Sequence, residues 1–285
     1  MSIAAVPLYL IASVSAPIKI MAMYLIYRSI RPLEPWPEFQ AFLTRTTLKY
    51  PYFRRQQLIF ESDQAVPKPD SSTLLAAFPH GAVCMGWTVN LNLKESLQKG
   101  KIVYLAATSL FYVPFIRDLL TWCSSGPASK SFMQEHMRTG RNLAILPGGF
   151  EEAAIYRENE YNIFLKERKG FIKYALEYGY RISPVFTFGE EATYSSLNAF
   201  SGIRLALARR QIPGILFWSK FGLFPERNAG LTTIVGEPII LPKIECPSTE
   251  DVEKYHNKFV MALRSLFDKY KAECASDPNT ELNIY

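Results

Sequence analysis

His80 is the histidine of this chain whose surroundings are best suited to catalysis. It follows an apolar run, Thr73 to Phe78, that we interpret as a buried strand, and it stands between Pro79 and Gly81. Proline makes such a turn rigid, and glycine lets a substrate approach the backbone. Because an imidazole changes charge near neutral pH, His80 can take a proton from a hydroxyl group and return it. A structural histidine at the end of a strand is the alternative.

A second candidate segment starts at Pro147, directly after another apolar run. We expect the N–H groups of Gly148 and Gly149 to point into the crevice beyond the sheet and to bind an oxyanion or a phosphate oxygen. Glu151 and Glu152 then supply a carboxylate, and the spacing leaves open which of the two faces the site. An ordinary glycine-rich turn is the alternative interpretation.

Arg168, Lys169 and Lys173 open a later predicted helix. The N-terminal end of a helix dipole attracts anions, so these cations suit the phosphate of a cofactor. A solvated basic face is the alternative.

The motifs of several other classes of enzyme are absent from the sequence. It contains no G-x-S-x-G elbow, no G-x-x-x-x-G-K-[ST] loop, no strand-linked G-x-G-x-x-G and no histidine cluster for zinc. His136 and His256 fall inside predicted helices, where we expect structural or exposed roles. A mechanism that uses one histidine, a carboxylate and backbone donors, without a metal, is what the sequence predicts.

The composition indicates a globular protein with an anionic partner. Of the 285 residues 48% are hydrophobic and 20% are charged, so a sizeable core is expected. The net charge of +6 favours a phosphate-bearing ligand or an acidic membrane surface. No nucleic-acid-binding signature is found. The four cysteines are far apart, which disfavours a disulfide framework.

The N-terminal segment, residues 1–30, is predicted to associate with a membrane. From Ile3 to Tyr27 the only charged residue is Lys19, and a bilayer span takes roughly 20 apolar residues. Pro17 divides the run, so one kinked span and a re-entrant hairpin both remain open, with a buried helical hairpin of a soluble protein as the third reading. Arg28 and Arg31 follow, which favours a cytosolic C-terminal side.

We interpret residues 31–70 as a membrane-proximal lead-in, with a solvated linker as the alternative, and residues 71–285 as the catalytic domain. Its alternating pattern predicts an α/β fold with a mixed, largely parallel sheet flanked by helices. The last helix should begin with a capping box at Ser248 and pack on the sheet, and Gly140 and Gly179 should end two others. Predicted strands cover 73–78, 102–106, 142–146, 181–188, 214–218 and 231–236, and predicted helices cover 82–98, 113–122, 129–139, 168–178 and 250–271.

Six blocks in order make the chain resemble the type 2 diacylglycerol acyltransferase family, which also contains monoacylglycerol and wax-alcohol acyltransferases. The family motifs are H-P-H-G, P-x-x-R, G-G-x-x-E, R-x-G-F, V-P-x-x-x-F-G-E and V-G-x-P-I. The first histidine of H-P-H-G is Phe78 here. The matching blocks are Phe78 to Gly81, Pro114 to Arg117, Pro147 to Glu152, Arg168 to Ala175, Ser183 to Glu190 and Val235 to Ile239.

The resemblance implies a glycerolipid-acyltransferase-like fold and an enzyme of the endoplasmic reticulum membrane, with its catalytic domain facing the cytosol and lipid droplets as a second location. Such an enzyme moves a fatty acyl group from acyl-CoA, a co-substrate rather than a bound cofactor, to diacylglycerol and makes triacylglycerol. By the same resemblance His80 is catalytic and Glu152 is preferred over Glu151. The partners are acyl-CoA, a neutral lipid and a membrane, with homo-oligomerisation left open. Further substrate contacts are expected from Phe78, Pro79, Gly81, Arg117, Arg168 and Lys169.

We therefore expect neutral His80 to deprotonate an acceptor hydroxyl, while the N–H groups of Gly148 and Gly149 stabilise the oxyanion and Glu152 orients the imidazole or holds the acceptor. Monoacylglycerol, a fatty alcohol, a sterol and a lysophospholipid are alternative acceptors. A phosphate-bearing acceptor is disfavoured, because no arginine adjoins the Gly148–Gly149 loop in the sequence. A non-catalytic lipid-droplet scaffold is the alternative from another class.

Overall fold

The computed structural model describes residues 5–31, 33–222 and 224–285, with side chains described from residue 16 onward. The chain divides into two units, Met1–Pro35 and Trp36–Tyr285. In the first unit, α1 (Ala5–Ile30) is one helix with Pro17 inside it, rather than two short helices joined by a turn. Residues 1–4 of the predicted membrane segment lie outside the described residues. No helix in the described part of the chain has both the length and the hydropathy needed to cross a bilayer.

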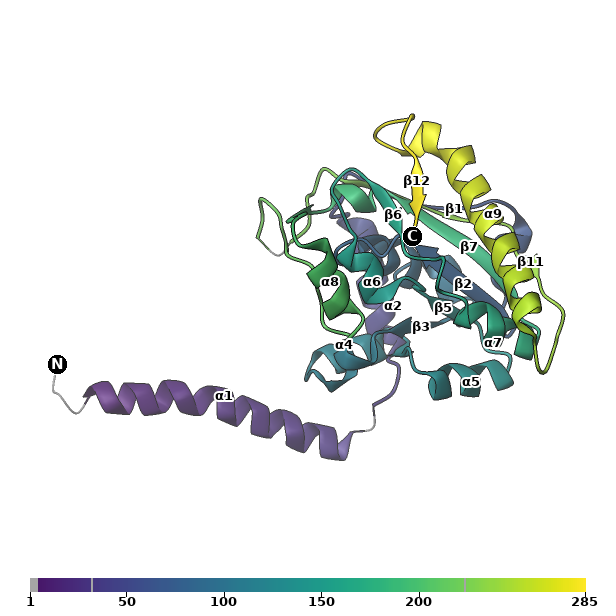
Figure 1. The fold of residues 1–285 in the computed structure, drawn as a ribbon. Helices are drawn as coiled ribbons and strands as arrows, with labels where there is room; N and C mark the ends of the chain where they lie inside the picture. Colours follow the sequence, from purple (N-terminus) through teal and green to yellow (C-terminus); the bar gives the residue numbers. More distant parts are fainter. Residues whose placement is uncertain (1–4, 32, 223) are drawn as a thin grey trace. The chain divides into compact units, whose positions relative to one another are not determined.

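The second unit is built on one mixed sheet (Figure 1). Five neighbouring strands, in the order β7-β2-β5-β3-β4, all run parallel. Strands β10 and β11 pair with β7 in the antiparallel sense, and β1 runs parallel to β10. The strands are β1 (Arg55–Phe60), β2 (Thr73–Phe78), β3 (Val103–Ala106), β4 (Ser125–Pro127), β5 (Leu143–Ile145), β7 (Arg181–Phe188), β10 (Gly230–Val235) and β11 (Ile239–Ile240). The prediction of a mixed, largely parallel sheet is therefore confirmed.

Helices and two small sheets surround this sheet. The helices are α2 (Pro37–Lys49), α3 (Glu95–Gln98), α4 (Ile116–Trp122), α5 (Lys130–Arg138), α6 (Gly149–Ala154), α7 (Gly170–Tyr178), α8 (Ser201–Ala208) and α9 (Thr249–Cys274), together with a π-helix, η2 (Trp87–Asn92). The small sheets join β6 (Tyr161–Ile163) to β12 (Leu282–Ile284) and β8 (Ser195–Ser196) to β9 (Phe217–Trp218).

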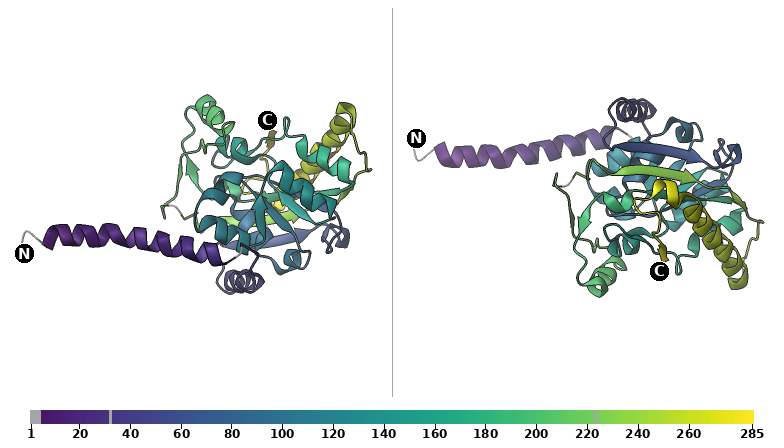
Figure 2. Two further views of the ribbon diagram at one scale, coloured as in Figure 1. Left: turned by 90° about the horizontal axis from the view of Figure 1, so that it is seen from below. Right: turned by 90° about the horizontal axis from the view of Figure 1, so that it is seen from above.

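Both faces of the central strand β2 are buried. Successive side chains of a strand point to opposite faces, and Leu74 and Phe78 pack in the core that contains Phe259 of α9, whereas Leu75 packs in a separate core with Leu91 of η2. Helix α9 thus covers one face, where it lies along β7 (Figure 2), and η2 covers the other. Burial on both faces explains why β2 reads as a continuous apolar run.

The sequence signals at the helix ends are confirmed. Ser248 caps α9 by accepting the N–H of Asp251, and the Asp251 side chain accepts the N–H of Ser248, which completes the predicted capping box. Gly179 ends α7 in the left-handed conformation, at φ 69°. The apolar stripe of α9 is buried as expected, including Leu263 and Leu266.

Residues 36–70 of the predicted lead-in lie in the same compact unit as the rest of the chain, and β1 joins its sheet, while the predicted place of this segment near a membrane stays a prediction. Two predictions about elements need correction. Residues 82–98 do not form one helix, because Cys84 adopts a positive φ of 45° and the chain turns before η2 begins. The strand predicted over 214–218 is only the two residues of β9.

Ser248→Ala should lower the free energy of unfolding by about 1 kcal/mol, because it leaves N–H groups of the first turn of α9 without their acceptor. Thermal or denaturant unfolding of the full chain measures the change. Ser265→Ala on the exposed face of the same helix is the matched control and should leave the midpoint unchanged. Equal effects of the two substitutions would contradict the role of the cap.

Candidate active site

The carboxyl ends of the five parallel strands bring together the segments singled out in the sequence. His80 follows β2, Pro147 follows β5 and Glu190 follows β7, and these three strands are neighbours in the sheet. In α/β sheets the crevice at this edge is where ligands bind. The sheet therefore places the histidine, the glycine pair and several carboxylates at one edge.

His80 is half-buried, and its ring nitrogens have distinct roles. Nδ1 lies 3.1 Å from the carbonyl oxygen of Gly81. Because a carbonyl oxygen only accepts hydrogen bonds, this contact assigns the proton to Nδ1 and leaves the lone pair on Nε2. Burial lowers the pKa of His80 below its ordinary value of 6.5, although hydrogen bonds with backbone groups oppose the shift. A neutral imidazole with a free Nε2 is the form that can accept a proton at neutral pH.

Glu152 accepts a hydrogen bond from the backbone N–H of His80 and not from its ring. Its Oε1 accepts the backbone N–H of His80, and its Oε2 accepts the N–H of Phe164 at 2.8 Å. The residue is 1% exposed. Burial raises the pKa of Glu152 to about 8, while the two N–H donors and Arg168 lower it. Glu152 therefore contacts the main chain and not the imidazole, and the expectation that it orients the ring or holds the acceptor stays a prediction.

A second buried carboxylate, Glu190, holds the same segment from the other side. It accepts the N–H groups of Met85 at 2.6 Å and Gly86 at 2.7 Å. Gly81 has a φ of +63°, and a Cβ there would lie 2.8 Å from Oε1 of Glu190, so only glycine fits. Burial raises the pKa of Glu190 to about 8. No role for Glu190 is predicted from the sequence, although it follows a strand in the same way as His80.

Gly148 and Gly149 differ in the space that a side chain would have at each position. A Cβ on Gly148 would overlap the carboxylate of Glu152, so this glycine makes room for that side chain. Gly149 has a φ of +54° and open space where a Cβ would be. In the described part of the chain, no carbonyl acceptor is found for the N–H of either glycine, as is usual at the start of a helix such as α6.

Of the predicted cations, Arg168 reaches this site and Lys169 turns away from it. Arg168 pairs with Glu151, and its guanidinium lies 5.3 Å from the ring centre of Phe164. Arg168, which is distant in the sequence, thus lies beside Glu151, two positions after the glycine pair. That a phosphate-bearing acceptor is disfavoured stays a prediction. Lys169 pairs with Glu253 of α9. Glu152 is buried against the His80 and Phe164 N–H groups, whereas Glu151 pairs with Arg168, and the preference for Glu152 as the functional glutamate stays a prediction.

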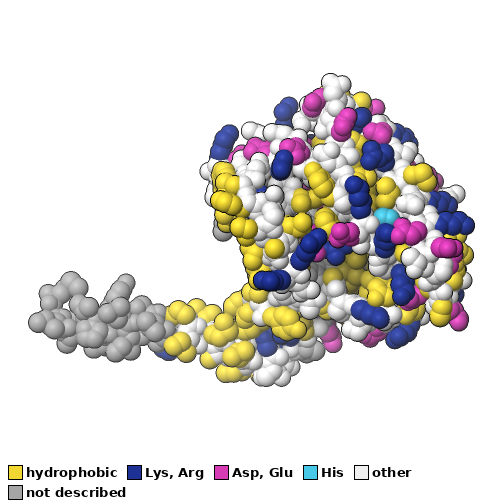
Figure 3. Space-filling view, viewed as in Figure 1, with side chains coloured by type: hydrophobic (Ala, Val, Ile, Leu, Met, Phe, Trp, Pro, Cys, Tyr) yellow, Lys and Arg dark blue, Asp and Glu magenta, His cyan; other side chains and the backbone are white. Residues whose placement is uncertain are grey.

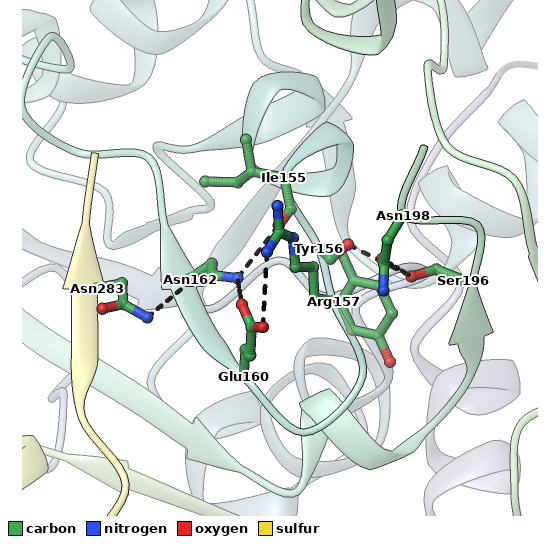
Figure 4. Close-up of polar contacts among 8 residues, drawn as sticks. All are labelled: Ile155, Tyr156, Arg157, Glu160, Asn162, Ser196, Asn198 and Asn283. Carbon is green, nitrogen blue, oxygen red and sulfur yellow. Dashed lines mark hydrogen bonds and ion pairs between the residues drawn. The ribbon is translucent and has the colours of Figure 1, made fainter. Parts of the chain in front are cut away.

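The segment that follows α6, Ile155 and Tyr156, accepts hydrogen bonds from side chains on two sides (Figure 4). Toward β6, Asn162 donates to the carbonyl of Ile155 at 3.4 Å and to Glu160 at 2.8 Å. Toward β8, the hydroxyl of Ser196 donates to the carbonyl of Tyr156 at 3.4 Å. These bonds join the segment that carries Glu152 to the strands on either side.

The comparison with protein families agrees with this geometry. The family model described as diacylglycerol acyltransferase matches residues 49–285, which include every residue of the site.

The chain belongs to the diacylglycerol acyltransferase family.

Among its relatives, diacylglycerol O-acyltransferase 2 of Dictyostelium discoideum is 33% identical, over 85% of this chain and 79% of the relative. The human 2-acylglycerol O-acyltransferase 3 is 32% identical over 76% of this chain and 69% of its own length. Acyl-CoA wax alcohol acyltransferase 2 of the mouse is also 32% identical, over 76% of this chain and 71% of the relative. The solved structure of the 1-acyl-sn-glycerophosphate acyltransferase PlsC from Thermotoga maritima has the same fold, with a TM-score of 0.51, 15% identity and 93% of each chain covered.

The remaining residues predicted to contact substrate, and the two other histidines, lie in the core or away from the site. Phe78 is 0% exposed and packs against Phe259, so the expected substrate contact is replaced by a place in the core. Pro79 is also buried. Arg117 lies on α4, and the described residues include no bond from its side chain to the site, so its role stays a prediction. His136 stacks on Phe132, and buried His256 lies 3.0 Å from the carbonyl of Leu165 through Nε2, as expected of structural histidines.

Gly148→Ala should reduce acyl transfer by about 10²-fold, because the added methyl displaces the Glu152 carboxylate from the His80 backbone and small displacements of catalytic groups are costly. Initial rates with acyl-CoA and diacylglycerol measure the loss. Gly202→Ala, in α8 with open space around it, is the control and should retain the wild-type rate. Full activity of Gly148→Ala would show that transfer does not depend on the close packing of the Glu152 carboxylate against Gly148.

Proposed function

We propose that this protein transfers a fatty acyl group from acyl-CoA to the free hydroxyl of diacylglycerol, and that His80 is the general base. The observation that carries the proposal is the position of the imidazole at the carboxyl edge of the sheet, in a chain of this family. Its Nδ1 faces the Gly81 carbonyl, and its Nε2 has no hydrogen-bond partner among the described residues. Nε2 takes the hydroxyl proton as the alkoxide oxygen attacks the thioester carbon. The thiolate of CoA then leaves and receives that proton from the imidazolium.

The glycine loop and the cation next to it support the remaining steps. The unengaged N–H groups of Gly148 and Gly149 are proposed to bind the oxyanion of the tetrahedral intermediate, where one such donor is commonly worth about 10²–10³ in rate. Arg168, 33% exposed in its side chain, is proposed to contact a CoA phosphate when its pair with Glu151 opens. Acyl-CoA is a co-substrate here.

Diacylglycerol is the acceptor we favour, and two other alcohols remain as candidates for a specific reason. Relatives named for 2-acylglycerol and for wax alcohol share 32% identity with this chain, almost as much as the diacylglycerol acyltransferase at 33%. Only the acceptor differs between these reactions, so the same His80 chemistry serves all three.

We also propose that the enzyme works at the endoplasmic reticulum membrane, with the catalytic unit in the cytosol. In α1, apolar side chains such as Met23 and Ile30 are 70% and 73% exposed. In the second unit, Trp218 and Phe224 are 50% and 67% exposed. Exposed aromatic and aliphatic side chains of this kind favour contact with a lipid surface.

Microsomes that contain the protein should transfer radiolabelled acyl groups from acyl-CoA to diacylglycerol, and a parallel panel of monoacylglycerol, fatty alcohol, sterol and lysophospholipid ranks the acceptors. His80→Gln should lower transfer by about 10²-fold or more, since it removes the base. His136→Gln is the matched control and should leave transfer intact. Droplet binding without consumption of acyl-CoA with any acceptor would instead identify a scaffold.

The pH profile tests the protonation state of His80. Because burial lowers its pKa below 6.5, the base stays neutral at pH 6.5 and is lost only as the pH falls further. We expect kcat/KM to decline on the acidic side with a midpoint below 6.5, measured over a range in which the fold stays intact. A midpoint above 6.5 would contradict the assignment.

A further inference from the structure

A cavity of about 380 Å³ lies between α8 and the segment that follows it. Its volume is within the usual range for small-molecule sites, about 300–1,000 Å³. The lining is almost entirely apolar, which suits a hydrocarbon ligand. The main apolar contributors are Phe200, Ile203, Leu207, Pro213, Ile215 and Leu216.

Arg204 is the one charged residue among those that line this cavity. It is 8% exposed, and two of its nitrogens are used: Nε donates to the carbonyl of Gly214 at 3.0 Å and Nη1 to that of Leu197 at 2.7 Å. Its third nitrogen, Nη2, is buried and has no acceptor among the described residues. A buried donor without a partner is costly, so a ligand oxygen that accepts from Nη2 would be stabilised there.

The mouth of the cavity is apolar as well. Phe200, Ile203 and Leu216 are 70%, 62% and 65% exposed. Figure 3 shows apolar side chains gathered over the edge of the catalytic unit that carries α8. A ligand that enters past exposed hydrocarbon and ends beside one buried cation has a long apolar body and an oxygen at one end.

The cavity is next to the candidate active site. Ile215 lines it and also packs with the cluster that contains Ala82 and Val83, which directly follow the His80 turn. Helix α8 contacts α6, which carries Glu152. The hydrogen bond from the Ser196 hydroxyl to the Tyr156 carbonyl links β8, which precedes the cavity, to the segment after α6 (Figure 4).

We propose that this cavity binds one fatty acyl chain, whose ester, thioester or carboxylate oxygen accepts a hydrogen bond from Nη2 of Arg204. The inference rests on the proposed transferase function for its link to His80, but binding of the chain can be measured without turnover. The chain can belong to the glyceride acceptor, to acyl-CoA or to a free fatty acid, which share this chemistry.

The test is photocrosslinking of the full-length protein with a long-chain fatty acid that carries a diazirine, used as the free acid, as its diglyceride and as its CoA thioester. Peptide mass spectrometry then locates the adducts. We expect label within residues 197–216, and the probe that labels them most strongly identifies the source of the chain.

Leu207→Trp should fill the cavity and lower this labelling by about tenfold or more, whereas Leu205→Trp, on the same helix but outside the lining, should not. Ile203→Trp, at the exposed rim, is a second filling variant in case Leu207→Trp unfolds, which melting curves would reveal. Equal labelling of folded filling and control variants, or absence of label from 197–216, would overturn the proposal.

The transferase itself is assayed separately, so the two failures are distinguishable. His80→Gln should keep the labelling of 197–216 while it loses transfer. Wild-type protein that is labelled there but transfers to no acceptor would refute the transferase and leave the chain site standing. Wild-type protein that transfers but is labelled elsewhere would refute the chain site alone.

Discussion

The catalytic edge depends on two buried carboxylates that accept backbone N–H groups from the segment carrying His80. Glu152 reaches this segment from the end of β5 and Glu190 from the end of β7, on either side of β2. Burying carboxyl groups is costly unless donors surround them, and here the donors belong to the turn that must be positioned. Among the described residues these two carboxylates bond the main chain and not the imidazole ring, which is consistent with the proposed role of Nε2 as a proton acceptor.

The glycines around the site follow from this arrangement. Gly81 and Gly148 are small because Glu190 and Glu152 respectively occupy the space that a side chain would need. A glycine-rich loop in such a site is therefore not only a source of exposed N–H groups. It also lets a buried acid pass close to the main chain, and the two functions coexist in the pair Gly148–Gly149.

Much of this layout could be predicted from the sequence. The apolar runs before His80 and Pro147 predicted β2 and β5, and the rule that parallel strands end at one edge brought their following residues together. The capping box predicted the start of α9. The roles of Glu190 and Gly148 could not be predicted, because they depend on side chains that meet across strands far apart in sequence. Short strands such as β4 and β6 lack a periodic pattern long enough to recognise. The helix predicted over 82–98 is interrupted where Cys84 has a positive φ and where the N–H groups of Met85 and Gly86 bond Glu190, a residue distant in the sequence.

The way in which the α8 region is attached determines which changes of sequence the sheet can tolerate there. The two ends of the stretch between β8 and β9 are paired by a two-residue ladder, Ser195 with Trp218 and Ser196 with Phe217, and α8 within it packs on α6. Because its ends are held together, a change in the length of this stretch does not have to alter the strands of the main sheet. Insertions or replacements there can reshape the apolar cavity beside α8 while the strand ends that position His80 and Glu190 stay the same.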